Sequence, residues 1–424
     1  MIDNILRKNI VSLFSMRIAS YIVPLITIPY LVKTLGATNF GMLSFSLAII
    51  QYFVMIVNYG FDLNTTKKIA ESKHDKNKVS EIFWSVISAR ILLAFLGIVI
   101  IYIISLLSSD INNVLDVIIF GYIVVIGTAL FPQWLFQGKE QLGVISTCRI
   151  IIQLLTIPLF FLFVNSPDDI SMAAFISGIS PILLSMTSYY LIVRREWISF
   201  IFPRFENIRK EMIDSWPIFL SSFAGSMYLN SLPVILGFVA TPTSVAIYVA
   251  ADKLVVAAQG IYTSLSSAFY PRINYLYSIN QDKAISFIKY ALKIQLTIAL
   301  IATLSLFGFS SIVVELLYGK EFVESALVLK ILSPLPIIIG IGSVLGIQTL
   351  LVFGYKKELS STYLNIGVLS LFISIPLSIY FDYIGTAISI VIIELLVSLS
   401  FYFKAKRRNL NVFHGLWRAR SMKQ

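Results

Sequence analysis

Apolar residues along the chain gather into long runs separated by short polar segments, and this pattern continues from one end to the other. A helix needs roughly 20 apolar residues to cross a hydrocarbon core of ~30 Å. The runs therefore predict an all-α polytopic membrane protein without a separate soluble domain. They predict twelve spans, near residues 10–32, 41–60, 82–107, 115–137, 147–164, 171–193, 216–239, 244–270, 287–317, 327–353, 359–381 and 384–403.

The longest polar segment between spans, residues 194–215, divides the spans into two sets of six. We expect a six-helix lobe over 1–205, a second over 206–403 and a basic tail over 404–424. Lobes with an even number of spans insert in the same orientation, so a repeat between them would be parallel. Two pairs of similar segments support a repeat: 28–45 with 232–250, and 134–141 with 350–358. Two related lobes around a central cavity are the plan of a transporter.

The basic residues indicate how the spans are oriented. Of the 33 lysines and arginines, 26 fall at the two termini or in the loops on their side of the membrane, with Arg149 and Lys289 at the span edges counted among the loops, and five fall deeper inside spans. Only Lys33 and Lys320 fall in the loops of the other side. Because short basic loops stay in the cytoplasm, we expect both termini there.

Composition agrees with a membrane protein and excludes several other classes. Only 13% of the residues are charged and mean hydropathy is +0.85, whereas soluble domains carry about twice that charge. A net charge of +11 would suggest nucleic acid in a soluble protein, but here the loop asymmetry explains it, and we expect no nucleic-acid partner. The basic tail suits contact with anionic membrane lipids; the alternative is a stop-transfer anchor with a solvated tail.

No motif for catalysis or for a cofactor is present. The chain lacks the G-x-x-x-x-G-K-[ST], H-E-x-x-H, G-x-S-x-G and C-x-x-C patterns. Cys148 is the only cysteine, and His74 and His414 lie far apart in the sequence, so neither a disulfide nor a metal site is expected. We predict that the protein is not an enzyme and has no cofactor, and that an H⁺ or Na⁺ gradient or removal of the product drives transport.

Polar stripes run along the first two spans of each half. Arg17 shares one helical face with Ser20, Tyr21, Pro24 and Thr27. Such a narrow stripe along a whole helix is typical of a helix that lines a cavity. Further polar side chains in spans 2, 7 and 8 extend this predicted cavity, and the candidates for substrate binding among them are Gln51, Asn58, Asn230 and Gln259.

Charged residues inside the spans are costly in lipid, so they usually face a cavity or a partner. Arg17 and Arg90 fit a cavity, although each side chain is also long enough to reach the headgroups. Asp252 and Lys253 point about 100° apart on a helix and are not expected to pair with each other. Asp252 and Glu394 are candidates for ion coupling; the alternative for Glu394 is a carboxyl hydrogen-bonded to a neighbouring helix.

Three segments carry a resemblance to a known family: GATNFGMLSF, NYGFDLNTTKKIAE and FPQWLFQGKEQ. Together with the twelve-span plan they resemble the O-antigen and polysaccharide repeat-unit flippases. These belong to the multidrug/oligosaccharidyl-lipid/polysaccharide (MOP) exporter superfamily. The resemblance implies a V-shaped pair of six-helix lobes in a bacterial inner membrane. Its implied substrate is an undecaprenyl-diphosphate-linked oligosaccharide, which alternating access moves from the cytoplasmic to the periplasmic leaflet.

The resemblance also implies roles for individual residues. Arg17 matches an arginine that holds the diphosphate in related lipid flippases, and Arg90 and Lys253 would be auxiliary cations. Ser222 stands opposite Arg17 in the second half, so a symmetric clamp is not expected. A polysaccharide polymerase and the chain-length machinery are the implied partners.

Two alternatives remain open at the level of sequence. An ion-coupled multidrug or small-solute exporter of the same superfamily shares the architecture. A polysaccharide polymerase or ligase is the enzymatic alternative, but such enzymes use long external loops that this chain lacks. The deep charges are more basic than acidic, which favours an anionic substrate over an organic cation.

Overall fold

The computed structural model describes residues 4–410 and 412. Side chains are described from residue 23 onward, apart from residues 221, 224–229, 261, 262, 264 and 268. Helices and short connections make up this part of the chain, and no strand occurs in it. The predicted all-α fold is confirmed.

The chain divides into two compact units, residues 1–250 with 317–322, and residues 251–316 with 323–424. The first contains α1 (Asn4–Asn58), α2 (Phe61–Glu71), α3 (Lys76–Leu107), α4 (Ser109–Asn113), α5 (Leu115–Gly121), α6 (Ile123–Leu130), α7 (Gln133–Gly138), α8 (Leu142–Phe163), η1 (Pro167–Asp169), α9 (Ile170–Arg194), α10 (Phe205–Val239) and η2 (Lys320–Phe322). Helices α11 (Pro242–Ile279) and α13 (Ser310–Tyr318) pass from one unit to the other. The second contains α12 (Gln281–Gly308), α14 (Val323–Leu332), α15 (Leu335–Ser343), the π-helix η3 (Val344–Leu351) and α16 (Lys356–Arg407). The lobes predicted at 1–205 and 206–403 stay a prediction.

Nine helical segments within the described residues are long and apolar enough to cross a membrane. Helices α1 and α16 each contain one residue outside helical geometry, Gly36 (φ 73°) and Asp382 (φ 54°), so each consists of two helices joined there. Glycine reaches the left-handed region without a steric penalty, which explains the break at Gly36. Helix α10 adds a shorter apolar stretch, Asn230–Val239. These features are consistent with the predicted twelve spans, and the protein is a multi-pass membrane protein.

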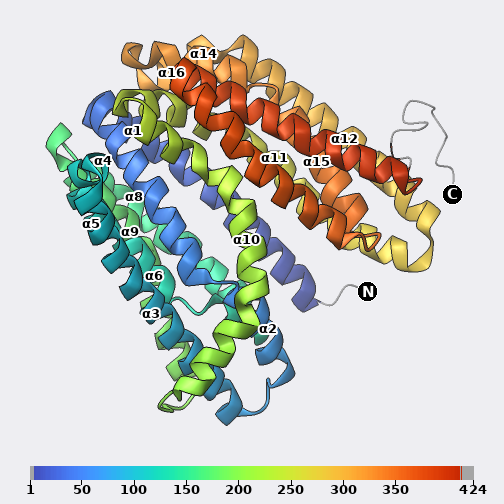
Figure 1. Cartoon of the computed structure of the whole chain (residues 1–424). Coiled ribbons are helices and arrows are strands. Elements are labelled where there is room, and N and C mark those ends of the chain that lie inside the picture. Colours follow the sequence, from blue (N-terminus) through green and yellow to red (C-terminus); the bar gives the residue numbers. More distant parts are fainter. Residues whose placement is uncertain (1–3, 411, 413–424) are drawn as a thin grey trace. The chain divides into compact units, whose positions relative to one another are not determined.

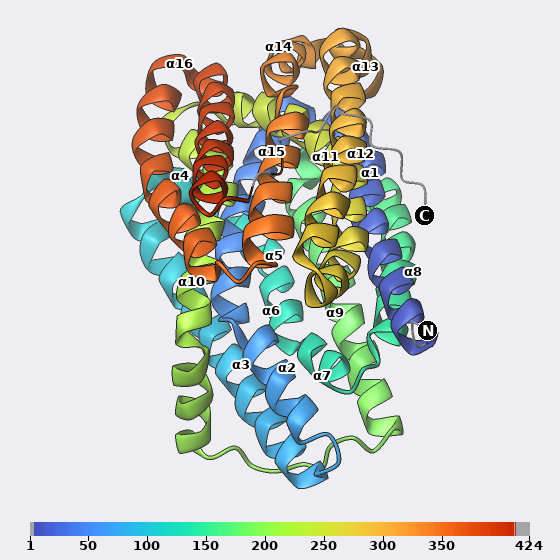
Figure 2. The same ribbon diagram turned by 90° about the vertical axis from the view of Figure 1, so that its right-hand side faces the viewer.

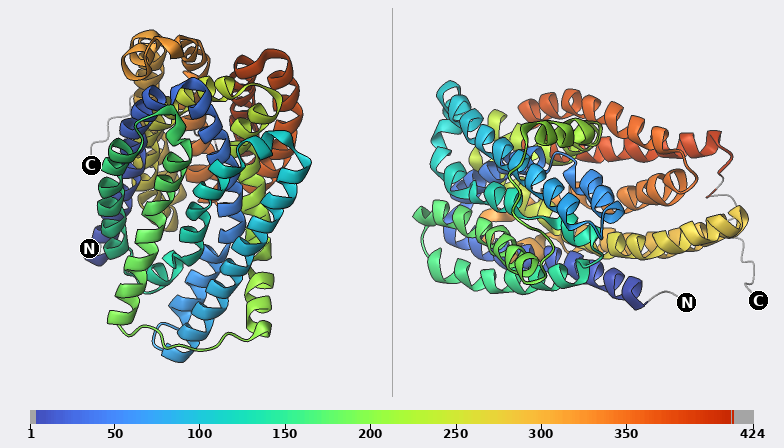
Figure 3. Two further views of the ribbon diagram at one scale, coloured as in Figure 1. Left: turned by 90° about the vertical axis from the view of Figure 1, so that its left-hand side faces the viewer. Right: turned by 90° about the horizontal axis from the view of Figure 1, so that it is seen from below.

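In the first unit, α1 packs against α6, α8, α9 and α10, while α2 packs against α7 (Figure 1). Small residues permit these close approaches, as at Gly138 of α7, where an added Cβ would lie 2.6 Å from the Ile69 side chain of α2. A segment without regular structure, residues 195–204, connects α9 to α10 (Figure 3). The packing brings the ends of α1, α6 and α7 together around one interior region.

In the second unit, α12 packs against α15, and α16 packs against α14, α15 and η3 (Figure 2). An apolar cluster that includes Ile273, Ile288 and Val344 forms part of its core. Within this core, Gln348 of η3 donates a hydrogen bond of 2.7 Å to Ser266 Oγ. This bond gives two buried side chains of the core a partner, which offsets the cost of placing them among apolar groups.

The backbones of helix α1 and of the first residues of α11 lie close to each other. A Cβ built on Gly41 would lie 1.7 Å from the Pro242 carbonyl oxygen. One turn away, the hydroxyl oxygens of Thr38 and Thr243 are 3.3 Å apart. Both threonines lie in the pair of segments, 28–45 and 232–250, whose sequences resemble each other.

We predict that Gly41→Ala destabilises the protein, because the added methyl group forces α1 away from α11. Overpacking of this kind costs about 1–3 kcal/mol. The midpoint of thermal unfolding in detergent, followed by intrinsic fluorescence, should fall by several degrees. Gly308→Ala is the matched control, since a Cβ there meets no atom within 4 Å. Equal midpoints for the two variants would contradict the close approach.

Candidate functional site: two cavities in the first unit

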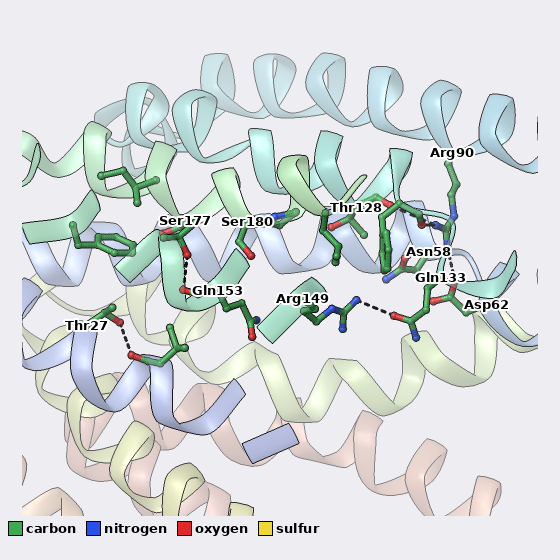
Figure 4. A pocket seen from close by; sticks show the side chains of 17 residues that line it. Thr27, Asn58, Asp62, Arg90, Thr128, Gln133, Arg149, Gln153, Ser177 and Ser180 are labelled. Atoms are coloured by element: carbon green, nitrogen blue, oxygen red, sulfur yellow. Dashed lines mark hydrogen bonds and ion pairs between the residues drawn. The ribbon is translucent and has the colours of Figure 1, made fainter. Parts of the chain in front are cut away.

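A polar cavity of about 510 Å³ lies inside the first unit (Figure 4). We call it the arginine cavity. Helices α1, α2, α3, α6, α7, α8 and α9 all contribute to its lining. Its polar side chains are Thr27, Asn58, Asp62, Arg90, Thr128, Gln133, Arg149, Gln153, Thr156, Ser177 and Ser180. So many inward polar groups at membrane depth indicate a functional cavity more than a structural core.

Arg90 of α3 is almost fully buried, with 1% of its side chain exposed, and forms the firmest interaction in the cavity wall. Its Nη2 atom lies 2.7 Å from Asp62 Oδ1 and 3.3 Å from Asn58 Oδ1. Its Nη1 atom donates to the Phe131 carbonyl at 2.9 Å. This carbonyl can accept because Pro132 separates α6 from α7 and interrupts the helical ladder. The guanidinium thus joins α3 to α1, α2 and the end of α6, instead of extending toward the headgroups.

Arg149 of α8 is the second arginine of the cavity. Its Nη2 atom donates to Gln133 Oε1 at 3.0 Å, and its guanidinium carbon lies 5.1 Å from the centre of the Phe131 ring. Among the described residues, the lining therefore contains two guanidinium groups but only one carboxylate, that of Asp62. Charges interact strongly in surroundings of low dielectric constant. A cavity with this excess of positive charge favours an anion.

A second cavity, of about 330 Å³, lies between α1, α2 and α10. We call it the amide cavity, because carboxamides dominate its polar lining. Its residues are Gln51, Val54, Met55, Asn58, Gly60, Asp62, Leu63, Ile218, Phe219, Ser222 and Asn230. Asn58 and Asp62 line both cavities, so the two adjoin.

Four of the residues predicted from the sequence lie in these cavities: Gln51, Asn58, Arg90 and Asn230. Gln51 and Asn58 are seven residues apart in one helix, and Asn230 approaches from α10. Their functional roles stay predictions, since being brought together does not establish binding.

The other predicted residues lie elsewhere. Arg17 belongs to α1, but its side chain lies outside the described residues. Asp252, Lys253 and Gln259 are partly buried on the α11 segment of the second unit. Glu394 is buried in α16, with 4% of its surface exposed. Ion coupling and substrate binding by these residues stay predictions.

Sequence reasoning missed Arg149 and Phe219. The predicted span near 147–164 has Arg149 at its edge, and we count this residue with the basic residues of the preceding polar segment, 138–149. The structure starts α8 at Leu142, which puts Arg149 two turns inside it. The apolar sequence on both sides of Arg149 was the available signal.

Comparison with known proteins places the chain in a family. The model of the family described as "Polysaccharide biosynthesis protein" matches residues 6–276. An Escherichia coli (strain K12) protein named "Putative O-antigen transporter" is 36% identical over 93% of this chain and 95% of its own length. A Shigella dysenteriae protein of the same name is 31% identical over 94% of this chain and 100% of its own.

Solved structures of MOP superfamily transporters share the fold. An inward-facing multidrug resistance MATE family transporter aligns with a TM-score of 0.68, 17% identity and coverage of 93% of this chain and 99% of its own. A MOP superfamily transporter from Pyrococcus furiosus, whose title describes a binding pocket of reverse polarity, aligns with a TM-score of 0.57 and 16% identity over 93% and 96% of the chains. The predicted MOP fold is confirmed.

The two relatives are named as transporters, and transporters are not enzymes. The predicted transporter class is thereby confirmed at this coarse level. The family model covers more than half of the chain, and relatives above 30% identity cover nearly all of it. The chain belongs to the polysaccharide biosynthesis protein family.

Proposed function

We propose that this protein is a flippase for an undecaprenyl-diphosphate-linked oligosaccharide, such as an O-antigen repeat unit. In this proposal it moves the molecule from the cytoplasmic to the periplasmic leaflet of a bacterial inner membrane by alternating access. The names of the two relatives support the substrate class. The observation that carries the proposal is the arginine cavity, with two guanidinium groups and one carboxylate in its lining.

A diphosphate needs a cationic partner to leave water. Guanidinium groups suit this task, because their planar donors bind phosphate oxygens in pairs. Arg90 already shares its charge with Asp62 at 2.7 Å. Arg149 also lines this cavity, and its guanidinium donates to the neutral Gln133 Oε1 at 3.0 Å. We assign the diphosphate to this guanidinium.

Helix α1 contains both Arg17 and a residue of the arginine cavity. Thr27, the last member of the stripe that begins at Arg17, lines the arginine cavity. In the proposed cycle Arg17 meets the diphosphate first, and Lys253 is an auxiliary cation. Protonation or Na⁺ binding at Asp252 or Glu394 couples the cycle to an ion gradient.

The proposed substrate also has consequences for the lipid tail, the orientation of the protein and its partners. The polyprenyl tail stays in lipid while the headgroup occupies the cavities. Both termini face the cytoplasm, in agreement with the loop asymmetry. A polysaccharide polymerase with its chain-length machinery consumes the product on the periplasmic side. A drug exporter for organic cations would need an excess of negative charge, and the lining of the arginine cavity has the opposite sign.

We predict that Arg149→Gln abolishes most transport while the protein still folds. Loss of charge-assisted hydrogen bonds to the diphosphate removes at least ~1.5 kcal/mol, which corresponds to about tenfold or more in rate. The gene is deleted in its native host, and lipid-linked repeat units are located with an impermeant probe on intact spheroplasts. The deletion strain should accumulate them on the cytoplasmic face. Wild type should relieve this accumulation, and Arg149→Gln should not.

Arg195→Gln is the matched control. Arg195 also donates to a glutamine, Gln141 Oε1 at 3.1 Å, and also lies 5.1 Å from an aromatic ring, that of Trp197, but it lines neither cavity. It should restore transport like wild type. Accumulation on the outer face, or none, would exclude the flippase. Full relief by Arg149→Gln would leave the flippase standing and exclude Arg149 as the diphosphate ligand.

We predict that Arg90 acts mainly on stability. Arg90→Met removes the cation that pairs with Asp62 and leaves the Phe131 carbonyl with the backbone N–H of Gln133 alone. Removing one partner of a buried ion pair costs about 3–5 kcal/mol, and less here because 38% of the Asp62 side chain is exposed. The midpoint of thermal unfolding should fall clearly below that of Arg149→Met. The reverse order of the two midpoints would contradict this division of roles.

A further inference from the structure

The lining of the amide cavity differs in chemistry from that of the arginine cavity. Its described residues include the carboxamides of Gln51, Asn58 and Asn230 and the hydroxyl of Ser222, and no lysine or arginine is among them. A carboxamide presents a donor and an acceptor side by side, as adjacent hydroxyl groups of a sugar require. The only formal charge in the lining, that of Asp62, is already paired with Arg90.

Asn58 lines the amide cavity as well as the arginine cavity. Its Oδ1 atom accepts from Arg90 Nη2 at 3.3 Å. The carbonyl oxygen of this amide therefore already has a donor, the Arg90 guanidinium in the wall of the arginine cavity. Its amide nitrogen carries two N–H donors, which suit sugar hydroxyl oxygens on the side of the amide cavity.

An aromatic ring completes the lining. Phe219 lines the amide cavity, and Tyr59 stacks on it with ring centres 4.6 Å apart and an angle of 14°. Trp216 and Phe223 also contact the Phe219 ring, at 5.5 Å and 5.6 Å. The C–H face of a sugar ring packs well on an aromatic ring of this kind. Because the neighbours fix the orientation of Phe219, little ordering is needed when a ligand binds.

Contacts between α2 and α10 hold this arrangement in place. Lys68 Nζ lies 2.9 Å from Glu211 Oε1 and 2.7 Å from Asp214 Oδ2. At the other end of α2, Gly60 has a φ of 76°, and a Cβ there would lie 2.8 Å from the Ile218 side chain. The backbones therefore approach closely beside Phe219, and the position of its ring relative to α1 is fixed.

We propose that the amide cavity is the sugar subsite of the transported molecule. This inference rests on the proposed function, and it adds a location for the first sugars of the oligosaccharide. The first sugar is bonded directly to the diphosphate, so its subsite must adjoin the phosphate subsite. The amide cavity meets this condition, because Asn58 and Asp62 line both cavities.

Binding to the purified full-length protein tests the inference. The two probes are a short-chain polyprenyl diphosphate without sugar and the same lipid carrying the complete oligosaccharide. For Phe219→Ala we expect affinity for the oligosaccharide-bearing lipid to fall about tenfold. Affinity for the sugar-free lipid should stay unchanged. Phe219→Tyr keeps the aromatic face and should bind both probes like wild type.

Two controls separate this effect from misfolding. Phe205→Ala changes an exposed phenylalanine of the same helix that lines neither cavity, and it should leave both affinities unchanged. Phe219→Leu keeps an apolar side chain without the aromatic face, and it should lose affinity for the oligosaccharide-bearing lipid alone. Thermal unfolding of each variant is measured in parallel.

The outcomes distinguish the two proposals. If wild type binds neither probe, the proposed function fails. If wild type binds both and Phe219→Ala binds both equally well, the sugar subsite is overturned while the flippase stands. Equal losses for both probes would also overturn the subsite, because they would show that Phe219 supports the whole site and not the sugar.

Discussion

The ion pair between Arg90 and Asp62 is the interaction on which both cavities depend. A guanidinium that is 1% exposed at membrane depth needs a partner for its charge, and here both Nη atoms have partners. The partners come from the end of α1, the start of α2 and the segment after α6, so Arg90 connects these three places to α3. The same pair forms part of the wall between the arginine cavity and the amide cavity. Because the positive charge of Arg90 and the negative charge of Asp62 offset each other, the other lining residues decide which ligands suit each cavity.

Charge, and not fold, separates the functions available to this architecture. The fold is shared with multidrug transporters at 16–17% identity, and one fold supports many substrates. In the described part of this chain, Asp62 offsets one arginine and Arg149 adds a second positive charge to the same lining. An organic cation gains nothing from such surroundings, whereas a phosphate does. The contrast between an anionic and a cationic substrate therefore rests on a few residues within one unit.

Much of the fold follows from the sequence, because lipid leaves the backbone no alternative to helices. The seven-residue spacing of Gln51 and Asn58 also places them on one face of a helix in advance. The helix start at Leu142 does not follow in this way, and the span predicted near 147–164 leaves Arg149 at its edge instead of two turns inside α8. Nor does the sequence reveal that Arg90 forms the ion pair with Asp62. Arg90 meets Asp62 only because α3 folds back onto α2, 28 residues later in the chain.

A transporter must also release what it binds, and the ion pair bears on this requirement. Favourable sites in a transport path have to be weak enough to let the substrate leave. With two arginines and no carboxylate, the arginine cavity would hold a diphosphate strongly and release it slowly. Asp62 reduces that attraction without removing the donors of Arg149. The amide cavity adds recognition through uncharged groups, whose hydrogen bonds exchange readily with water. For the proposed glycolipid substrate, moderate charge beside neutral polar groups would thus combine binding with release.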